Sequence, residues 1–279
     1  MTDKYAVIGN PIAHSKSPEI HTMFAEQFKG MSAGDMVYQD RILAPLEEDG
    51  FKAKIFQLRD AGYKGCNVTV PFKFEAFKLA AVHKLHAGIA QAVNTLKFEG
   101  DTIIGNNTDG IGLHRDIQFN LGITLKNKRV LLIGAGGAAN GVALPLGHAG
   151  AKITIVNRTV DKAQALATRT SDNSEALVIS HTYTEIVGQQ FDVVINATST
   201  GLSDEMPPLH PGLFATGALA YEMMYGRETP FMKFAREQGA AIVSDGLGML
   251  VEQAAESFFF WRGAYPRTAP VIAALRNAQ

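Results

Sequence analysis

Two short stretches carry residue types that could perform acid–base chemistry. In "NVTVPFK" (67–73) a strand-like alternation ends at a proline, and Lys73 follows where a helix could begin. In "GNNTDGIG" (105–112) a polar, glycine-rich turn holds one carboxylate, Asp109. A cation in the first turn of a helix faces the positive end of the helix dipole, at a cost of roughly 0.3–1 kcal/mol. A nearby carboxylate would offset this cost, so we predict that Lys73 and Asp109 form one reaction centre. An exposed lysine without a role is the alternative.

Polar side chains near these stretches could hold a small polar ligand. Alternation places Asn67 and Thr69 on one side of a strand near its carboxyl end, where open α/β sheets bind ligands. Ser15 and Ser17 lie between a strand and a helix, where two hydroxyls could bind a carboxylate. Ser17 also fits the N-cap of that helix, with Pro18 at its first position, and capping does not exclude ligand contact.

A nucleotide-binding fingerprint lies in the second half of the chain. "GAGGAA" (134–139) follows an apolar strand and opens a helix, with Gly134, Gly136 and Ala139 in the G-x-G-x-x-A spacing. Gly134 permits the tight turn, Gly136 lets the backbone approach a pyrophosphate, and Ala139 keeps helix and strand close. A glycine triplet alone also fits a plain strand-to-helix turn. The strand before it and the helix after it favour dinucleotide binding.

The next strand indicates which dinucleotide is bound. NAD-specific versions usually end this strand with an acidic residue that binds the ribose 2′-hydroxyl. Here Asn157, Arg158 and Thr159 end it, and Lys162 follows. A guanidinium matches a 2′-phosphate through forked, charge-assisted hydrogen bonds, although an ordinary loop arginine beside a capping threonine is the alternative. The missing carboxylate and the added cations favour NADP(H) as the cofactor.

Alternating strand and helix patterns must position these residues. The first series predicts strands at 5–9, 36–42 and 66–70, helices at 18–29 and 46–61, and a hairpin through "AVNTLKF", "EGD" and "TIIG". The second series predicts strand 129–134, helices 137–149 and 160–170, and later strands that include "ALAYEMMY" (218–225). We therefore predict an α/β protein of two domains. Residues 1–108 form a mostly parallel α/β sheet domain to which C-terminal helices in 246–279 return, and residues 109–245 form a Rossmann-type NADP-binding domain.

Composition narrows the class of protein. With 26 basic and 27 acidic residues the net charge is −1, which argues against a nucleic-acid partner. Cys66 is the single cysteine, so no internal disulfide forms, as is typical of a reducing cytosol. No apolar run reaches membrane-spanning length, the start lacks a secretory pattern, and the histidines lack metal-ligand spacing. We expect a cytoplasmic monomer or homodimer that binds a small molecule, with no metal and no membrane contact.

Eight motifs in a fixed order resemble one enzyme family. They are "GNPIAHSKSP", "NVTVPFK", "AVNTL", "NNTDGIG", "GAGGAA", "NRT", "NATSTG" and "DGLGMLVEQA". Each motif alone is modest evidence, but the ordered set, from residue 5 to about residue 270, is similar to the shikimate dehydrogenase family. The resemblance implies reduction of 3-dehydroshikimate to shikimate with NADPH, on the pathway to chorismate and the aromatic amino acids.

The resemblance also implies a role for each matched residue. It makes Lys73 and Asp109 the catalytic pair. The implied substrate-binding residues are Ser15, Ser17 and Tyr225 at the carboxylate, and Asn67, Thr69, Asn94 and Gln253 at the ring hydroxyls. The implied cofactor-binding residues are Gly134, Ala135, Gly136, Gly137, Ala138, Asn157, Arg158, Thr159, Lys162, Ala197, Thr198, Met223 and Gly246.

Four positions depart from the family pattern, and three other functions stay open. Gln91 stands where glycine is common, Glu222 where aspartate is usual, Lys162 where arginine is frequent, and Leu85 where a polar residue is common. A relative acting on quinate or an aminated shikimate shares nearly every motif. A folate-linked dehydrogenase should lack the "NNTDG" and "HSKSP" pair. A nucleotide-sensing regulator without turnover is disfavoured by the intact Lys73 and Asp109.

Overall fold

The apolar strands sort into two sheets, each at the centre of its own unit. The computed structural model describes residues 2–198 and 204–278. Unit 1 comprises residues 1–112 and 251–279, and unit 2 comprises residues 113–250. The chain passes between the units within α5 (Asp109–Arg115) and α9 (Leu247–Arg262). These divisions lie a few residues later than 108/109 and 245/246, so Asp109 belongs to the same unit as Lys73.

Unit 1 is built on a mixed six-stranded sheet in the order β2-β1-β3-β5-β6-β4. Its strands are β1 (Asp3–Gly9), β2 (Met36–Leu43), β3 (Tyr63–Val68), β4 (Val82–His83), β5 (Thr95–Glu99) and β6 (Thr102–Asn106). β1 pairs in parallel with β2 and β3, whereas β5 is antiparallel to β3 and β6. The predicted hairpin of β5 and β6 is confirmed, with Gly100 at φ +57 in its turn. It lies inside the sheet, because the short β4 pairs beyond it.

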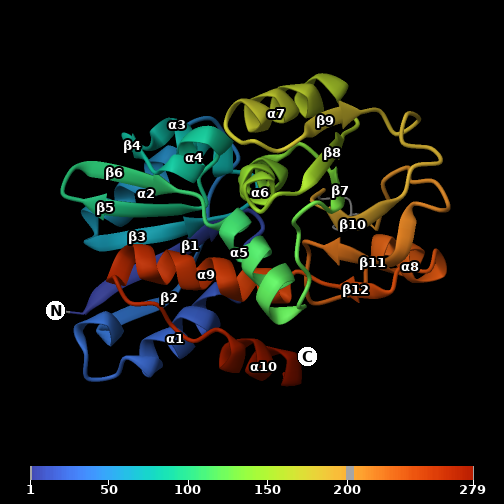
Figure 1. Cartoon of the computed structure of the whole chain (residues 1–279). Coiled ribbons are helices and arrows are strands. Elements are labelled where there is room, and N and C mark those ends of the chain that lie inside the picture. Colours follow the sequence, from blue (N-terminus) through green and yellow to red (C-terminus); the bar gives the residue numbers. More distant parts are fainter. Residues whose placement is uncertain (1, 199–203, 279) are drawn as a thin grey trace. The chain divides into compact units, whose positions relative to one another are not determined.

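Both faces of this sheet are buried by helices (Figure 1). One face packs Ile8, Cys66 and Val68 against α2 (Gly50–Asp60), α3 (Lys73–Leu79) and α4 (Leu85–Ala90). The opposite face carries Tyr5 and Tyr38 and lies against α1 (Ser17–Gln27) and α9. The 3-10 turn η1 (Ser32–Gly34) follows α1, and α10 (Ala269–Asn277) packs on α1.

Three predicted boundaries in unit 1 are wrong. The helix expected from residue 46 begins at Gly50, because Asp49 before it adopts a left-handed conformation with φ 60. The strand expected at 66–70 spans Tyr63–Val68, and Val70 is exposed where the chain leaves the sheet towards Pro71. Ser17 is the first residue of α1 rather than its N-cap, which is Lys16. Sequence periodicity therefore finds these elements but not their ends.

Unit 2 is built on a parallel six-stranded sheet in the order β12-β11-β10-β7-β8-β9. Its strands are β7 (Arg129–Ile133), β8 (Lys152–Val156), β9 (Val178–His181), β10 (Phe191–Asn196), β11 (Phe214–Glu222) and β12 (Ile242–Ser244). Counted from its first strand, this order is 3-2-1-4-5-6, that of a dinucleotide-binding sheet. The predicted strand 218–225 ends at Glu222, so Met223 and Tyr225 lie beyond it.

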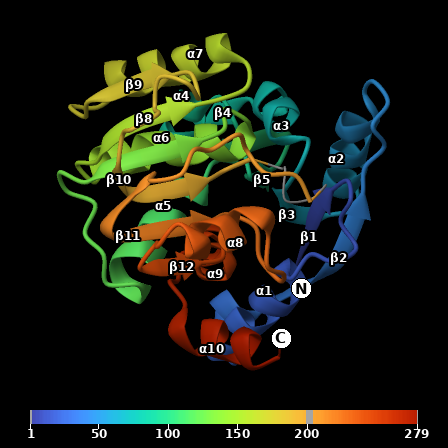
Figure 2. The same cartoon turned by 90° about the vertical axis from the view of Figure 1, so that its right-hand side faces the viewer.

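Helices cover both faces of this sheet (Figure 2). α6 (Gly137–His148) and α7 (Val160–Asp172) bury one face, together with the π-helical turn η2 (Asp116–Asn120). α8 (Pro230–Glu237) buries the other through Phe231 and Ala235. The sequence did not predict α4, α5 or α8. In the described parts of the chain, none of the helices is long and apolar enough to cross a bilayer.

Candidate active site

Lys73 and Asp109 form a nearly buried ion pair in unit 1. Lys73 begins α3 and Asp109 begins α5, and Lys73 Nζ lies 2.5 Å from Asp109 Oδ2. The two side chains are 12% and 6% exposed. Because little water screens them, their attraction is stronger than that of a surface pair. The structure brings together the two residues that the sequence predicts to form one reaction centre.

Asn94 holds the other oxygen of the Asp109 carboxylate. Its Nδ2 donates to Asp109 Oδ1 at 2.8 Å, and its Oδ1 accepts the backbone N–H of Thr108 at 2.9 Å. A backbone N–H can only donate and a carboxylate can only accept, so these two contacts fix the orientation of the amide. Both oxygens of Asp109 are therefore engaged, one by a cation and one by an amide.

Gln253 of α9 joins the same group. Its Oε1 accepts from Asn94 Nδ2 at 3.2 Å and from Thr108 Oγ1 at 3.3 Å. α9 comes so close to α5 that a Cβ on Gly112 would lie 2.6 Å from the backbone nitrogen of Gln253. Only a glycine at residue 112 permits this approach, which explains the second glycine of "DGIG".

Asn67 and Thr69 occupy the end of β3, on the path from the sheet to Lys73. Asn67 is buried; its Oδ1 accepts from Tyr38 Oη at 2.8 Å, and its Nδ2 donates to Ser257 Oγ at 3.0 Å and Thr95 Oγ1 at 3.1 Å. Thr69 lies just past β3 and is half-buried. Hydrogen bonds link nine polar side chains of unit 1, which we call the polar cluster: Tyr38, Asn67, Lys73, Asn94, Thr95, Thr108, Asp109, Gln253 and Ser257.

The loop before α1 holds Ser15 and Ser17 in a fixed arrangement. Ser15 Oγ donates to Ser17 Oγ at 3.2 Å and accepts the backbone N–H of Ser17 at 3.3 Å. Arg41 of β2 donates to the Ser15 carbonyl at 2.8 Å and forms a bidentate pair with Glu19 at 2.7 and 2.8 Å. His14 in this loop is exposed, whereas His21 is buried and burial lowers its pKa to about 3.

In unit 2, the fingerprint turn connects β7 to α6. Gly134 has φ +113, and a Cβ there would lie 3.1 Å from the carbonyl oxygen of Ala197 at the end of β10. Ala139 is fully buried under the helix. Gly136 precedes α6, is exposed, and a Cβ there would meet nothing within 4 Å. This open backbone at a helix N-terminus fits the pyrophosphate of a dinucleotide.

Residues at four other strand ends lie beside this turn on the same edge of the sheet. Asn196 ends β10; its Nδ2 donates to the buried Glu222 at 2.8 Å, and its Oδ1 accepts from Thr198 Oγ1 at 2.7 Å. A Cβ on Gly246, which follows β12, would lie 2.3 Å from the Met223 carbonyl oxygen after β11. Asn157 follows β8 and its Nδ2 donates to the Thr159 carbonyl at 2.9 Å. We call these strand ends the cofactor edge.

The basic residues predicted to select the cofactor are accessible. Arg158, Thr159 and Lys162 are exposed at the start of α7, next to the cofactor edge. The positive charge of Arg158 lies near Tyr183, whose pKa burial raises to about 12 despite that charge. An exposed guanidinium beside a dinucleotide turn is able to bind a 2′-phosphate.

Several residues escaped sequence reasoning. In unit 1 they are Tyr38, Thr95, Thr108 and Ser257, whose residue types alone indicate no site. In unit 2, Asn140 Nδ2 donates to the carbonyls of Ala135 at 3.0 Å and Gly136 at 2.9 Å, while Arg169 bonds to its Oδ1. Asn140 therefore braces the fingerprint turn, and its place one residue after "GAGGAA" was the available signal.

Two residues that the sequence analysis named lie elsewhere in the fold. Tyr225 belongs to unit 2, and Leu85 is 66% exposed on α4.

The strand order of unit 2 and its glycine turn define the chain as a dinucleotide-binding α/β protein with a second α/β unit. Three family models match it: the shikimate dehydrogenase substrate binding domain at residues 7–96, shikimate/quinate 5-dehydrogenase at 117–203, and the shikimate 5′-dehydrogenase C-terminal domain at 246–276. The chain belongs to the shikimate dehydrogenase family.

Relatives along the full length agree with this assignment. The chain is 56% identical to the shikimate dehydrogenase (NADP(+)) of Methylobacillus flagellatus over 99% of this chain and 100% of that protein. It is 53% identical to the enzyme of the same name from Nitrosospira multiformis, over 100% of this chain and 98% of that protein. The shikimate 5-dehydrogenase of Thermus thermophilus, solved in complex with NADP(H) and shikimate, is 31% identical with a TM-score of 0.83, covering 99% of this chain and 100% of that one.

Proposed function

We propose that this protein is an NADP-dependent shikimate dehydrogenase that interconverts 3-dehydroshikimate and shikimate. The observation that carries the proposal is the Lys73–Asp109 pair inside the polar cluster of unit 1. The named activity of full-length relatives with half or more of their residues identical supports the same reaction. We assign unit 1 to the substrate and unit 2 to NADP(H).

The polar cluster provides what reduction of a ketone requires. NADP(H), held at the cofactor edge, supplies the hydride in one direction and accepts it in the other. Negative charge builds on the carbonyl oxygen during the step, and Lys73 Nζ can stabilise it and deliver the proton. Asp109 Oδ2 orients the ammonium at 2.5 Å. The pair acts as a unit, and either member can carry the proton between steps.

The remaining side chains bind and orient. Ser15 and Ser17, at the start of α1, offer hydroxyls to the substrate carboxylate. Asn67, Thr69, Asn94 and Gln253 bind ring hydroxyls. Asn94 has a second role in unit 1, because its Nδ2 donates to Asp109 Oδ1 and so holds the carboxylate towards Lys73. The fingerprint residues 134–138 and Ala197, Thr198, Met223 and Gly246 contact the dinucleotide, and Asn157, Arg158, Thr159 and Lys162 select its 2′-phosphate.

An absorbance assay of NADPH formation tests the proposal. Shikimate and quinate are each offered with NADP⁺ and with NAD⁺, and the highest kcat/KM is expected for shikimate with NADP⁺. Faster turnover of quinate than of shikimate would show that the protein is the relative that acts on quinate. Binding of NADP⁺ without turnover of either acid would show that it is a nucleotide sensor. Sedimentation checks that the active species, a cytoplasmic enzyme in this proposal, is a monomer or homodimer.

A further inference from the structure

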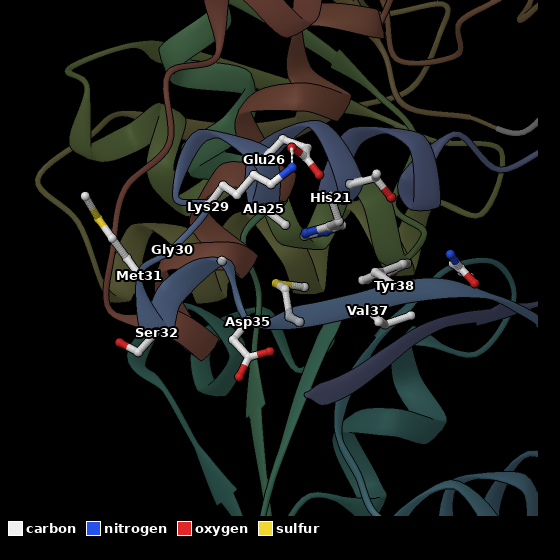
Figure 3. Close-up of a pocket in the computed structure, with 14 residues that line it drawn as sticks. His21, Ala25, Glu26, Lys29, Gly30, Met31, Ser32, Asp35, Val37 and Tyr38 are labelled. Atoms are coloured by element: carbon white, nitrogen blue, oxygen red, sulfur yellow. Dashed lines mark ion pairs between the residues drawn. The ribbon is translucent and has the colours of Figure 1, made fainter. Parts of the chain in front are cut away.

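Tyr38 is locked in place beside the polar cluster. It lies in the middle of β2, is 2% exposed, and its ring stacks on that of His21 with centroids 4.3 Å apart and planes 8° apart. The ring of Trp261 tilts against it at 6.0 Å. Figure 3 shows His21 of α1 and Tyr38 of β2 at one end of a hollow of about 530 Å³ that both residues line. The rings of His21 and Trp261, whose own centroids are 5.3 Å apart, pack together against Tyr38 and hold its ring in place.

The hydroxyl of Tyr38 points to the amide oxygen of Asn67. Tyr38 Oη donates to Asn67 Oδ1 at 2.8 Å. Burial raises the pKa of Tyr38 well above its usual value, and a hydrogen bond with Ser17 lowers it in smaller part, so the phenol stays protonated and remains a donor. Asn67 Oδ1 is thereby held on the side of β2. His21 also faces this amide, which raises the pKa of His21 in smaller part than burial lowers it, but neither ring nitrogen of His21 has a hydrogen-bond partner among the described residues. Within the described parts of the chain, Oδ1 therefore keeps one acceptor position.

The other partners of Asn67 hold the nitrogen end of its amide. Ser257 Oγ and Thr95 Oγ1 accept from Nδ2, because the Ser257 hydroxyl donates to the Gln253 carbonyl at 3.1 Å and the Thr95 hydroxyl donates to Asn94 Oδ1 at 2.9 Å. The Asn94 carbonyl oxygen is 3.4 Å from Nδ2, a long contact. Tyr38 holds the oxygen end of the amide. Without the Tyr38 hydroxyl, Oδ1 loses this donor and the amide is held at its nitrogen end alone.

We propose that Tyr38 is a positioning residue for shikimate binding: its hydroxyl fixes Asn67 so that the free acceptor position of Oδ1 receives a hydrogen bond from a ring hydroxyl. This role rests on the proposed function, since it assumes that Asn67 contacts the substrate. In this proposal Tyr38 acts through Asn67 and does not itself contact the substrate.

Tyr38→Phe tests the role, and Tyr5→Phe is a matched control. Tyr5 pairs with Tyr38 across the β1–β2 register, is 3% exposed, and stacks on the same Trp261. Its hydroxyl meets Arg262 at 3.4 Å rather than the polar cluster. KM for shikimate is expected to rise roughly five- to ten-fold in Tyr38→Phe and less than about two-fold in Tyr5→Phe. KM for NADP⁺ should stay within about two-fold in both variants, because the cofactor is assigned to unit 2.

Any other result contradicts either the positioning role of Tyr38 or the proposed dehydrogenase function. Equal KM values for shikimate in the two variants would overturn the role of Tyr38. If Tyr38→Phe is unfolded at the assay temperature, judged by circular dichroism, the wild type and both variants are assayed at a lower temperature at which Tyr38→Phe is folded; equal KM values for shikimate there overturn the role as well. Wild-type protein that does not reduce NADP⁺ with shikimate overturns the proposed function itself, so the two failures are distinguishable.

Discussion

The polar cluster of unit 1 and the cofactor edge of unit 2 are built on opposite principles. The cluster consists of buried side chains that bond to one another, as Asn94 does with Thr108, Asp109 and Gln253. The cofactor edge consists of backbone brought close by glycines, as at Gly134 and Gly246. A substrate with several hydroxyls requires donors and acceptors at fixed points, whereas a pyrophosphate requires accessible N–H groups. The chemistry of the ligand thus decides whether a site is made of side chains or of backbone.

The difference between the regions predicts where single side chains matter most. Lys73→Ala should lower kcat for shikimate oxidation by roughly 10²- to 10⁴-fold, with a smaller change in KM, because it removes the positioned cation. Lys78→Ala is the control, since Lys78 is an exposed lysine in the last turn of the same helix. Steady-state kinetics measure both variants. A rise in KM for Lys73→Ala with kcat intact would contradict the assignment.

At the cofactor edge the side chain with the largest expected effect is Arg158. Arg158→Ala should lower kcat/KM with NADP⁺ by roughly ten- to a hundred-fold, because it removes charge-assisted hydrogen bonds to the 2′-phosphate. The kcat/KM with NAD⁺, which lacks this phosphate, should stay nearly unchanged. Arg158→Lys keeps the charge without the planar fork, so an intermediate loss is expected. Equal losses with both cofactors would show that Arg158 does not select the 2′-phosphate.

His21 makes the stability of the unit 1 site dependent on pH. Burial lowers its folded-state pKa to about 3 from an unfolded value of 6.5, so its contribution is complete above pH 6.5 and is lost as pH falls towards 3. Between pH 8 and pH 5 the wild-type free energy of unfolding should fall by about 2 kcal/mol more than that of His21→Phe. Urea unfolding at the two pH values measures this. His14→Gln, which alters an exposed histidine, should keep the wild-type dependence, and identical dependence in all three proteins would contradict the prediction.

The smallest expected effect concerns backbone alone. Gln91 follows α4 with φ 51, which explains why a glycine suits this position. The free energy of unfolding should be higher for Gln91→Gly than for Gln91→Ala by roughly 0.5–1 kcal/mol, since both variants lose the Gln91 side chain and its contacts and only glycine adopts this conformation without the steric cost. Gln91→Ala removes the side chain but keeps the cost, so it separates the two contributions. A glycine variant no more stable than the alanine variant would argue against backbone strain here.

More of the cofactor edge than of the polar cluster could be predicted from the sequence. The fingerprint at 134–139 could be interpreted directly, because each glycine answers a local requirement of a turn. In unit 1, Lys73 and Asp109 could be proposed as a catalytic pair from their residue types and because each was expected just after a strand, where a helix or turn begins. The contacts of Asn94 with Asp109 and of Tyr38 with Asn67 could not, since they join residues 15 and 29 positions apart on different elements. Helix α4 and strand β4 also escaped, being too short for a periodic pattern.

The sequence by itself determined the alternation of strands and helices, the dinucleotide turn and the residue types available for catalysis. These depend on local properties: side-chain periodicity, glycine at positive φ and proline at a strand end. Tertiary structure decided that Asn94 donates a hydrogen bond to Asp109, that α9 packs closely against Gly112, and that Tyr38 donates a hydrogen bond to Asn67. Such roles arise only when distant segments are packed and each buried donor must find an acceptor, a condition that no local pattern contains.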